Sequence, residues 1–417
     1  MGKLAITGGA RVFAKDLSVK WPQFDRTDER ALLKVFRSGQ WWRGGTLEAQ
    51  AASECGRFER AFAKYHDAAY GLCVPNGTIA LELALRAAGV KAGDEVIVPS
   101  LSFVVSASAP LILGAVPVFA DADPKTYQPD PASIEAMISP RTTAIVIVHF
   151  AGYPANLDRI VPLARRHKLA LIEDCAHAQG SQWRGKGVGS YGDFGTFSFQ
   201  QSKALTSGEG GIVLCGTEEH WKRCYRFHNL GRREDEGFYD FHEMSSNYRL
   251  TDLQGALLNA QFARYRRQIV RKMAAQQRLA RHFREIGGVE PLPEDPRITR
   301  RGNYYWVFKY NAAEFAGASR ETFFAALKAE GVTATRSYGR AIHRYPLFQN
   351  LRQPARYKNA QYRRTSCPVA ERVFAEELCV FGHSLLLAER RDLDRIAEAV
   401  AKIKKYADEL RTVARTA

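Results

Sequence analysis

Three short stretches of this chain combine residue types that could bind a phosphate, pair with a positive charge and attack a carbonyl group. The first is Asn76-Gly77-Thr78, which precedes the apolar run from Ile79 to Ala88. Asn, Gly and Thr are typical of helix starts, and a helix N-terminus offers free N–H groups and partial positive charge to a phosphate. Taken alone, the same residues would also serve as an ordinary helix cap.

The second stretch carries an acidic residue at the end of an apolar run. Asp174 follows Leu171-Ile172-Glu173, and the carboxyl ends of parallel strands are where α/β proteins bind ligands. Its carboxylate could pair with a protonated ring nitrogen, hold a metal or simply cap a helix. His177 lies three residues further on, and a single histidine in such a place is more often structural than catalytic.

The third stretch contains a lysine between an apolar run and a glycine-rich segment. Lys203 follows residues 195–199 and precedes Gly208-Glu209-Gly210-Gly211. A lysine that loses part of its hydration in such a site can form a Schiff base with a carbonyl. Most lysines are solvated surface residues, but the glycines indicate a tight turn and the preceding run is typical of a buried strand.

A phosphate cradle, an acid for a ring nitrogen and a Schiff-base lysine are together the three requirements of pyridoxal phosphate. They occur in this order, and Lys203 follows Asp174 by 29 residues, which fits successive strands of one sheet. The acid would keep the ring protonated, and the lysine would hold the aldehyde and later move a proton. The sequence therefore predicts pyridoxal phosphate as cofactor and no bound metal.

The elements that would position these residues are short apolar runs alternating with helical patterns. Continuous apolar runs are typical of strands buried on both faces, and strand–helix–strand succession indicates a mostly parallel sheet. A long helix is expected from Leu253 to Arg284, then a smaller α+β region with a closing helix near 388–411. The expected fold class is therefore α/β. The strand-like runs are residues 95–99, 115–120, 144–149, 169–173, 195–199 and 211–215.

The chain is strongly basic: its 417 residues include 60 Lys and Arg against 44 Asp and Glu, a formal net charge of +16. Such an excess points to nucleic acid, an acidic membrane surface or a phosphorylated small molecule. Residues 253–284 contain no Asp or Glu, yet they lack any RNA-binding motif or zinc-finger spacing. A basic helix face toward solvent or another subunit is the better interpretation, so no nucleic acid is expected as partner.

Cysteine usage and hydropathy favour a soluble cytoplasmic protein. The seven cysteines are irregularly spaced with no Cys-x-x-Cys pair, which argues against a disulfide framework and a zinc site. Residues 102–120 carry no charge, but Pro110 and Pro117 favour a buried helix followed by a strand over a membrane span. The N-terminus has no signal-peptide pattern, and no membrane is expected as partner.

With these residues in place, the sequence resembles the DegT/DnrJ/StrS family of pyridoxal-phosphate-dependent sugar aminotransferases. The resemblance implies the aspartate-aminotransferase-like fold, with a large domain built on a mostly parallel sheet and a smaller α+β C-terminal domain. It also implies a homodimer with active sites at the subunit interface. The expected division is an N-terminal arm at 1–57, a cofactor-binding domain at 58–262 and a small domain at 263–417. The motifs that carry the resemblance are at 38–42, 58–59, 76–81, 93–99, 173–177, 196–199, 203, 208–211, 246–250 and 345–347.

The resemblance also assigns roles to individual residues. Lys203 would be the Schiff-base lysine and the catalytic acid/base, and Asp174 would be the partner of the pyridine nitrogen. Gly77, Thr78 and Ser198 would bind the cofactor phosphate.

Three further positions complete the implied site. Phe103 would stack on the cofactor ring, and Asn247 would reach the phosphate of the neighbouring subunit's cofactor. His177 occupies a position where many members have Gln beside the phenolic oxygen of the cofactor, so its role is less defined.

The expected activity is transfer of an amino group from an amino acid, glutamine or glutamate, to a keto-cyclitol or keto-sugar. Residues 199–211 and 381–383 resemble aminotransferases of aminocyclitol antibiotic pathways. Residues 21–23 and 39–43 resemble aminohydroxybenzoate synthase, a dehydrating and aromatising relative that keeps the lysine, so this alternative stays open. A third hypothesis, from another class, is a non-catalytic nucleic-acid-binding regulator.

Overall fold

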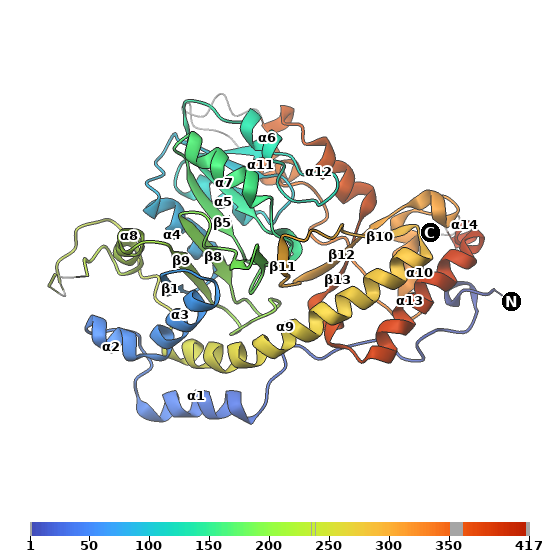
Figure 1. Cartoon of the computed structure of the whole chain (residues 1–417), viewed down its shortest axis with the longest axis horizontal. Helices are drawn as coiled ribbons and strands as arrows, with labels where there is room; N and C mark the ends of the chain where they lie inside the picture. The colour runs from blue at the N-terminus through green and yellow to red at the C-terminus, as the bar shows by residue number, and fades with distance from the viewer. Residues whose placement is uncertain (1, 235, 238, 351–361, 414–417) are drawn as a thin grey trace.

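A seven-stranded sheet forms the centre of the larger part of the molecule (Figure 1). The structure is a computed structural model and describes residues 2–234, 236–237, 239–350 and 362–413. In the order β1-β9-β8-β5-β4-β2-β3, the pairs from β8 to β3 are parallel and β9 is antiparallel to both neighbours. This confirms the predicted α/β class. The strands are β1 (Tyr70–Val74), β2 (Glu95–Pro99), β3 (Val116–Ala120), β4 (Thr142–Val148), β5 (Ala170–Asp174), β8 (Phe194–Ser198) and β9 (Gly211–Cys215).

Helices cover both faces of this sheet, so its strands are buried on both sides, as their continuous apolar sequences predict. Leu81 packs on one face and Phe62 on the other, and both side chains are almost completely buried. The uncharged stretch with Pro110 forms a helix and a strand, as predicted. The helices are α4 (Gly77–Ala87), α5 (Val105–Ile112) and α8 (Glu218–His228) on one face, and α3 (Glu54–Tyr65), α7 (Leu157–Arg166) and the first half of α9 (Asp252–Ile286) on the other.

A smaller antiparallel sheet with its own core lies beside the second half of α9. Phe283 of α9 packs there against Trp306 and Phe381 of the sheet. Figure 1 shows α9 running from the helices of the large sheet to α13, so one helix spans both cores. The predicted α+β C-terminal region is present, while the domain boundaries at 57/58 and 262/263 stay predictions. The elements are β10 (Val289–Pro291), β12 (Tyr305–Tyr310), β13 (Leu378–Gly382), α10 (Arg320–Ala329) and α13 (Arg390–Lys405).

The predicted closing helix is wrong at its C-terminal end, because α13 stops at Lys405. The chain turns there and brings the carboxylate of Glu409 to the N-terminal segment, where it accepts hydrogen bonds from the N–H groups of Lys3 and Leu4 at 2.8 and 3.1 Å.

The remaining elements are α1 (Arg26–Ser38), α2 (Leu47–Ala52), α6 (Pro131–Ala136), α11 (Pro346–Gln349), α12 (Pro368–Arg372), α14 (Leu410–Val413) and a third sheet of β11 (Ile298–Arg300), β6 (Gln182–Trp183) and β7 (Lys186–Gly187).

The acid-free basic run lies on α9, and part of its charge is neutralised by other elements. Arg264 pairs with Asp28 of α1 at 2.6 Å, and Arg278 pairs with Asp394 of α13 at 2.5 Å. The run therefore includes ion pairs that hold α1 and α13 onto α9. Within the described ranges, no helix is both long enough and apolar enough to cross a membrane.

A fully buried histidine beside the large sheet is bound as a neutral ring. The Nδ1 atom of His66 donates to the carbonyl of Val188 at 2.7 Å, and its Nε2 atom accepts the N–H of Gly180 at 2.9 Å. A second ring proton, on Nε2, would point at the N–H group of Gly180 inside the protein. Burial lowers the pKa of His66 to about 3.

We expect His66 to lower the free energy of unfolding as the pH falls. In the unfolded chain the side chain of His66 takes up a proton near pH 6.5, whereas in the folded chain it does not. The contribution of His66 to stability is therefore complete above pH 6.5 and declines below it. For His66 the free energy of unfolding should drop by about 1.4 kcal/mol between pH 7.5 and pH 5.5, and His177, His228 and His383 act in the same direction. Urea unfolding of His66→Gln should show a shallower pH dependence, whereas the exposed His167→Gln control should keep the full slope. Parallel slopes would contradict this prediction.

Candidate active site

A cavity of about 550 Å³ opens where strands of the large sheet end. It collects residues that are far apart in the sequence, from the start of α4, the segment before α5, the ends of β5 and β8, and the segments around 304 and 338. All but one of the sequence-predicted site residues line it, and the exception is Asn247. Those that line it are Gly77, Thr78, Phe103, Asp174, His177, Ser198 and Lys203.

The N-terminus of α4 lies directly beside Ser198 in the wall of this cavity. The side chain of Asn76 caps the helix by accepting the N–H of Ile79 at 2.9 Å. By helix geometry the N–H groups of Gly77 and Thr78 then have no intrahelical acceptor. Gly211, the first residue of β9, pairs with both Val74 and Ser198 and so places the two strand ends side by side. This arrangement fits an anion such as a phosphate.

Gly77 has no room for a side chain, and we expect Gly77→Ala to weaken cofactor binding. A Cβ atom there would lie 2.6 Å from the Cβ of Ser198, so the helix start or the serine must move away from the phosphate position. Such overpacking costs about 1–3 kcal/mol. The affinity of the apoprotein for pyridoxal phosphate, measured by fluorescence titration, should fall about tenfold.

Gly216→Ala is the matched control for this substitution. A Cβ at Gly216 meets no atom within 4 Å, so its affinity and stability should stay close to those of the parent chain. Equal affinities for the Gly77 and Gly216 variants would contradict the assignment of the α4 N-terminus to the phosphate.

Asp174 ends β5 with its carboxylate in a poorly hydrated position. One oxygen accepts the N–H of Ala176 at 3.0 Å, and the other accepts the Ser106 hydroxyl at 3.4 Å. Burial raises the pKa of Asp174, and the attraction of Lys203 offsets this only in part. A cation placed beside this carboxylate would stabilise its ionised form, which is what a protonated ring nitrogen would do.

Lys203 lies in a tight loop between β8 and β9. The loop closes through the N–H of Gln201, which donates to the carbonyl of Gly208 at 2.7 Å, and Gly208 has φ +85°. The Nζ atom of Lys203 lies 4.3 Å from the ring centroid of Tyr304. Burial lowers the pKa of Lys203, and the nearby Tyr304 and Asp174 counteract this only partly. A larger fraction of the amine is therefore unprotonated and nucleophilic at neutral pH.

His177 is buried and its hydrogen bonds fix one tautomer. Its Nδ1 atom accepts the N–H of Ala151 at 3.3 Å, so the ring proton resides on Nε2. Nε2 then donates to the hydroxyl of Tyr338 at 2.6 Å. Burial lowers the pKa of His177 well below its usual value, with Lys203 adding to the effect. Tyr338 accepts from the histidine and keeps its own proton for a group in the cavity.

Phe103 and Asn247 occupy different environments. The Phe103 ring is half exposed, lines the cavity and lies 5.4 Å from the ring of Tyr338. An exposed aromatic face at a cavity wall suits stacking on a planar ligand. Asn247 is exposed, lies outside the cavity of its own chain and uses its side-chain oxygen to accept the N–H of Arg249. Its predicted role concerns a neighbouring subunit and stays a prediction.

Among the cavity residues that sequence reasoning did not single out are two tyrosines, Tyr304 and Tyr338. Tyr304 stacks on His177 with ring centroids 4.2 Å apart and bonds the hydroxyl of Ser202 at 2.9 Å. The tyrosines lie 101 and 135 residues after Lys203 in sequence, in segments without a glycine-rich or capping motif. The only sequence signal is an aromatic pair, residues 304–305, at the start of a strand.

His149, Glu173 and Cys175 form a buried cluster next to β5 whose ring and carboxylate lone pairs are already used. His149 accepts the N–H of Ala155 at Nδ1 and donates from Nε2 to Glu173 at 2.9 Å. Glu173 also accepts backbone N–H groups, among them that of Tyr191 at 2.7 Å. Burial raises the pKa of the Cys175 thiol well above its usual value. The cluster therefore acts as a structural support for the strand that ends in Asp174.

Comparison with known proteins decides the family. The DegT/DnrJ/EryC1/StrS aminotransferase family matches residues 22–401 of the chain. The chain belongs to this family. It is therefore an enzyme, an aminotransferase, and family membership implies pyridoxal phosphate as the cofactor.

This aminotransferase is similar to proteins of two activities over nearly their full lengths. The L-glutamine:2-deoxy-scyllo-inosose aminotransferase of Streptoalloteichus tenebrarius is 38% identical, over 98% of this chain and 99% of the relative. The 3-amino-5-hydroxybenzoate synthase of Amycolatopsis mediterranei is 37% identical, over 91% and 96%. A crystal structure of 3-amino-5-hydroxybenzoic acid synthase superposes with a TM-score of 0.83 at 36% identity, over 93% of this chain and 99% of that one.

Proposed function

We propose that this aminotransferase uses pyridoxal phosphate to move an amino group from L-glutamine or L-glutamate to a keto-cyclitol. The observation that carries the proposal is the convergence of the α4 N-terminus, Asp174 and Lys203 on one cavity. The names of the relatives supply the glutamine donor and the scyllo-inosose type of acceptor. A keto-sugar linked to a nucleotide is the other acceptor to include in a test.

Each part of the cavity fits one part of the cofactor. The N–H groups of Gly77 and Thr78, with the Ser198 hydroxyl, would hold the phosphate, and the missing Cβ at Gly77 lets the helix start lie against Ser198. Asp174 would hold the protonated ring nitrogen. Phe103 would cover one face of the ring.

When bound, pyridoxal phosphate supplies an aldehyde that takes up an amino group and a ring that accepts electrons. Lys203 would hold the cofactor at rest and, once released, carry a proton between two carbon atoms of the bound substrate and cofactor. Its low hydration favours both tasks, because the amine must lose its proton before it can accept one. The Tyr304 ring beneath Nζ limits where the amine can move.

His177 would act as a positioning residue rather than as an acid or base. It is neutral, and it directs the hydroxyl proton of Tyr338 away from itself, since its own Nε2–H occupies the space between the two groups. Tyr338 would then donate to an oxygen of the cofactor or of the keto substrate.

A panel of substrates tests the proposed function. Purified enzyme loaded with pyridoxal phosphate would receive L-glutamine, L-glutamate or L-alanine as donor, and 2-deoxy-scyllo-inosose, scyllo-inosose or a nucleotide-linked keto-sugar as acceptor. We expect the aminated cyclitol as product, measured by mass spectrometry, with L-glutamine as donor. Turnover of the nucleotide-linked sugar alone would overturn the choice of acceptor.

A second candidate is a dehydrating, aromatising reaction of the 3-amino-5-hydroxybenzoate synthase type. It is favoured by the relative and the crystal structure that carry this name. The two reactions differ in product, because an aromatic ring absorbs in the near ultraviolet and an aminocyclitol does not. An aromatic product from an amino-cyclohexenone acid, with no amination of scyllo-inosose compounds, would replace the main proposal by this one.

We further infer that two copies of the chain form a homodimer with shared active sites. Exposed aromatic residues support an interface: Trp41 and Trp42 are 48% and 54% exposed, and Phe241 is 54% exposed. Asn247, outside the cavity of its own chain, would complete the phosphate site of the partner.

Mixing two inactive chains distinguishes shared from separate sites. A dimer of one Lys203→Ala chain and one Asn247→Ala chain contains one site with both residues intact, if Asn247 acts across the interface. We expect such mixed dimers to regain up to half of the parent activity. If Asn247 acts within its own chain, neither site is intact and the mixture should show no gain.

A further inference from the structure

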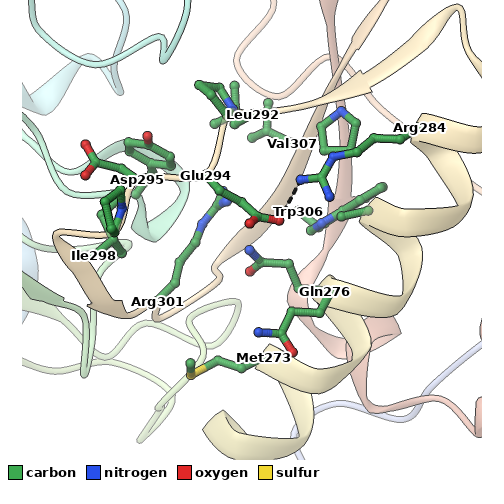
Figure 2. Close-up of a pocket in the computed structure, with 16 residues that line it drawn as sticks. Met273, Gln276, Arg284, Leu292, Glu294, Asp295, Ile298, Arg301, Trp306 and Val307 are labelled. Carbon is green, nitrogen blue, oxygen red and sulfur yellow. Dashed lines mark hydrogen bonds and ion pairs between the residues drawn. The ribbon is translucent and has the colours of Figure 1, made fainter.

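A second buried lysine, outside the active-site cavity, is linked to the loop that carries Lys203. Lys272 belongs to α9 and its side chain is completely buried. Its neighbour Met273 lines a separate cavity of about 340 Å³ beside the proline-rich segment 291–298 (Figure 2). Lys272 lines neither that cavity nor the active-site cavity. The role of its amine must therefore lie in contacts with other side chains.

The amine of Lys272 is held by a histidine and two aromatic rings. Its Nζ atom lies 3.1 Å from Nδ1 of His383. The ring centroids of Trp21 and Tyr265 lie 5.2 and 5.5 Å from the same atom. Burial lowers the pKa of Lys272 to about 7, and no carboxylate pairs with the amine among the described residues. Aromatic faces and a ring nitrogen thus replace the carboxylate that a buried lysine normally has.

The hydrogen bonds of His383 fix its tautomer. Its Nε2 atom lies 2.9 Å from the carbonyl oxygen of Ser202, which can only accept, so Nε2 carries the ring proton. Nδ1 therefore accepts from the Lys272 amine, which has hydrogens to donate whether or not it is charged. Burial and the nearby Lys272 lower the pKa of His383 well below its usual value, so the ring is neutral.

The Ser202 carbonyl belongs to the peptide unit that joins Ser202 to Lys203. At the other end of this unit, the N–H of Lys203 donates to a carbonyl of the same loop at 2.8 Å. One position earlier, the carbonyl of Gln201 accepts the indole N–H of Trp21 at 2.9 Å. The rings of Trp21 and His383 meet edge to face with centroids 4.4 Å apart. One aromatic pair therefore holds the two successive carbonyl groups that precede Lys203.

His383 also contacts the ring beneath the Lys203 amine. Its backbone N–H donates to the carbonyl of Tyr304 at 3.1 Å, and the two rings stack with centroids 5.9 Å apart. The hydroxyl of Tyr304 forms a hydrogen bond with that of Ser202 at 2.9 Å, and its ring lies 4.3 Å from Nζ of Lys203. The backbone and the amine of Lys203 are thus both in contact with groups that His383 binds.

We propose that Trp21, His383 and Lys272 are positioning residues for Lys203. The indole and imidazole N–H groups fix the backbone before the catalytic lysine, and the Lys272 amine keeps the proton of His383 on the nitrogen that faces Ser202. The three residues come from the segment before α1, from α9 and from the end of β13. They therefore link the orientation of Lys203 to the packing of the smaller core. This inference rests on the proposed role of Lys203.

The rate at which Lys203 captures the cofactor tests the positioning role. Apoprotein is mixed with saturating pyridoxal phosphate, absorbance gives a first-order rate, and borohydride trapping with mass spectrometry locates the bonded lysine. His383→Phe keeps a ring but loses both nitrogens, and we expect it to slow capture by about tenfold or more. His383→Gln should stay within about threefold of the parent rate, because its amide N–H replaces the donor to Ser202.

Lys272→Met separates positioning from general damage. Methionine has a similar shape but no donor, so Nδ1 of His383 loses its partner and capture should slow by about three- to tenfold. The unfolding temperature should equal or exceed that of the parent chain, since a buried charge is removed. In the His383→Phe background the same substitution should cause no further slowing, because both residues act on Lys203 through one hydrogen-bond chain.

His66→Phe is the matched control for His383→Phe. His66 is also fully buried and bound at both ring nitrogens, but its partners are Val188 and Gly180 and not residues of the lysine loop. This variant should lose stability and keep the parent capture rate. Trp21→Phe, which removes only the indole N–H, serves if His383→Phe does not fold, and should slow capture by about three- to tenfold.

Two kinds of result would overturn the inference, and they are distinguishable. Parent-like capture by His383→Phe, additive losses in the double variant, or equal slowing by His66→Phe would reject the positioning role while leaving Lys203 as the bonded lysine. Capture by the parent chain at a different lysine, or no capture at all, would instead reject the assignment of Lys203 and this inference with it.

Discussion

Lys203→Ala should lower the rate of amino transfer by at least about 10³-fold, because the substitution removes both the amine that holds the cofactor and the group that moves the proton. The amine is buried, and no other lysine lines the active-site cavity among the described residues. The measurement is single-turnover production of the aminated cyclitol. The absorbance spectrum of the purified protein should also change, because the cofactor no longer has a lysine to bind.

Lys91→Ala is the control for this variant, since Lys91 is an exposed lysine outside the cavity. It should keep both the parent spectrum and the parent rate. A Lys203→Ala enzyme with parent-like turnover would exclude Lys203 as the catalytic residue. Absence of cofactor absorbance from both the parent chain and Lys203→Ala would refute the choice of cofactor.

Asp174→Asn should reduce turnover by about 10²–10⁴-fold with little change in fold, since the amide has the size of the carboxylate but no charge. The carboxylate lies in a poorly hydrated site where an ionic partner is favoured strongly. Without it, a ring nitrogen would lose its proton and the ring would accept electrons less readily. The check is the rate of the half-reaction with L-glutamine, followed by absorbance.

Ser106→Ala separates the charge of Asp174 from its hydrogen bonding. Ser106 donates to Asp174 at 3.4 Å, so its loss removes only one long hydrogen bond to the carboxylate and should cost less than about fivefold. A similar loss in both variants would indicate that Asp174 acts through local structure rather than through its charge.

Much of the site is local in sequence and was therefore predictable. Gly77 and Thr78 follow a capping asparagine, Asp174 ends a strand, and Lys203 follows one; each lies on a short segment whose backbone conformation its own sequence determines. Alternation of apolar runs and helices indicated the order and direction of these segments. The strands that carry Asp174 and Ser198 are direct neighbours in the sheet.

The end of the closing helix and the role of His177 could not be predicted from local sequence. The chain leaves α13 after Lys405 because Glu409 binds the N–H groups of Lys3 and Leu4, about 400 residues away in sequence. No local propensity records such a contact. His177 likewise has its tautomer set by Ala151 and Tyr338, which come from other segments.

The sequence by itself determined the α/β class, the family and the residues proposed to bind the cofactor, because each of these depends on short motifs in a definite order. Tertiary structure alone decided that Tyr304 lies under Lys203 and that Tyr338 accepts a hydrogen bond from His177. The physical reason is that these are contacts between segments brought together by packing. Their energies depend on burial and on the partners that remain free, and neither is visible in residue spacing.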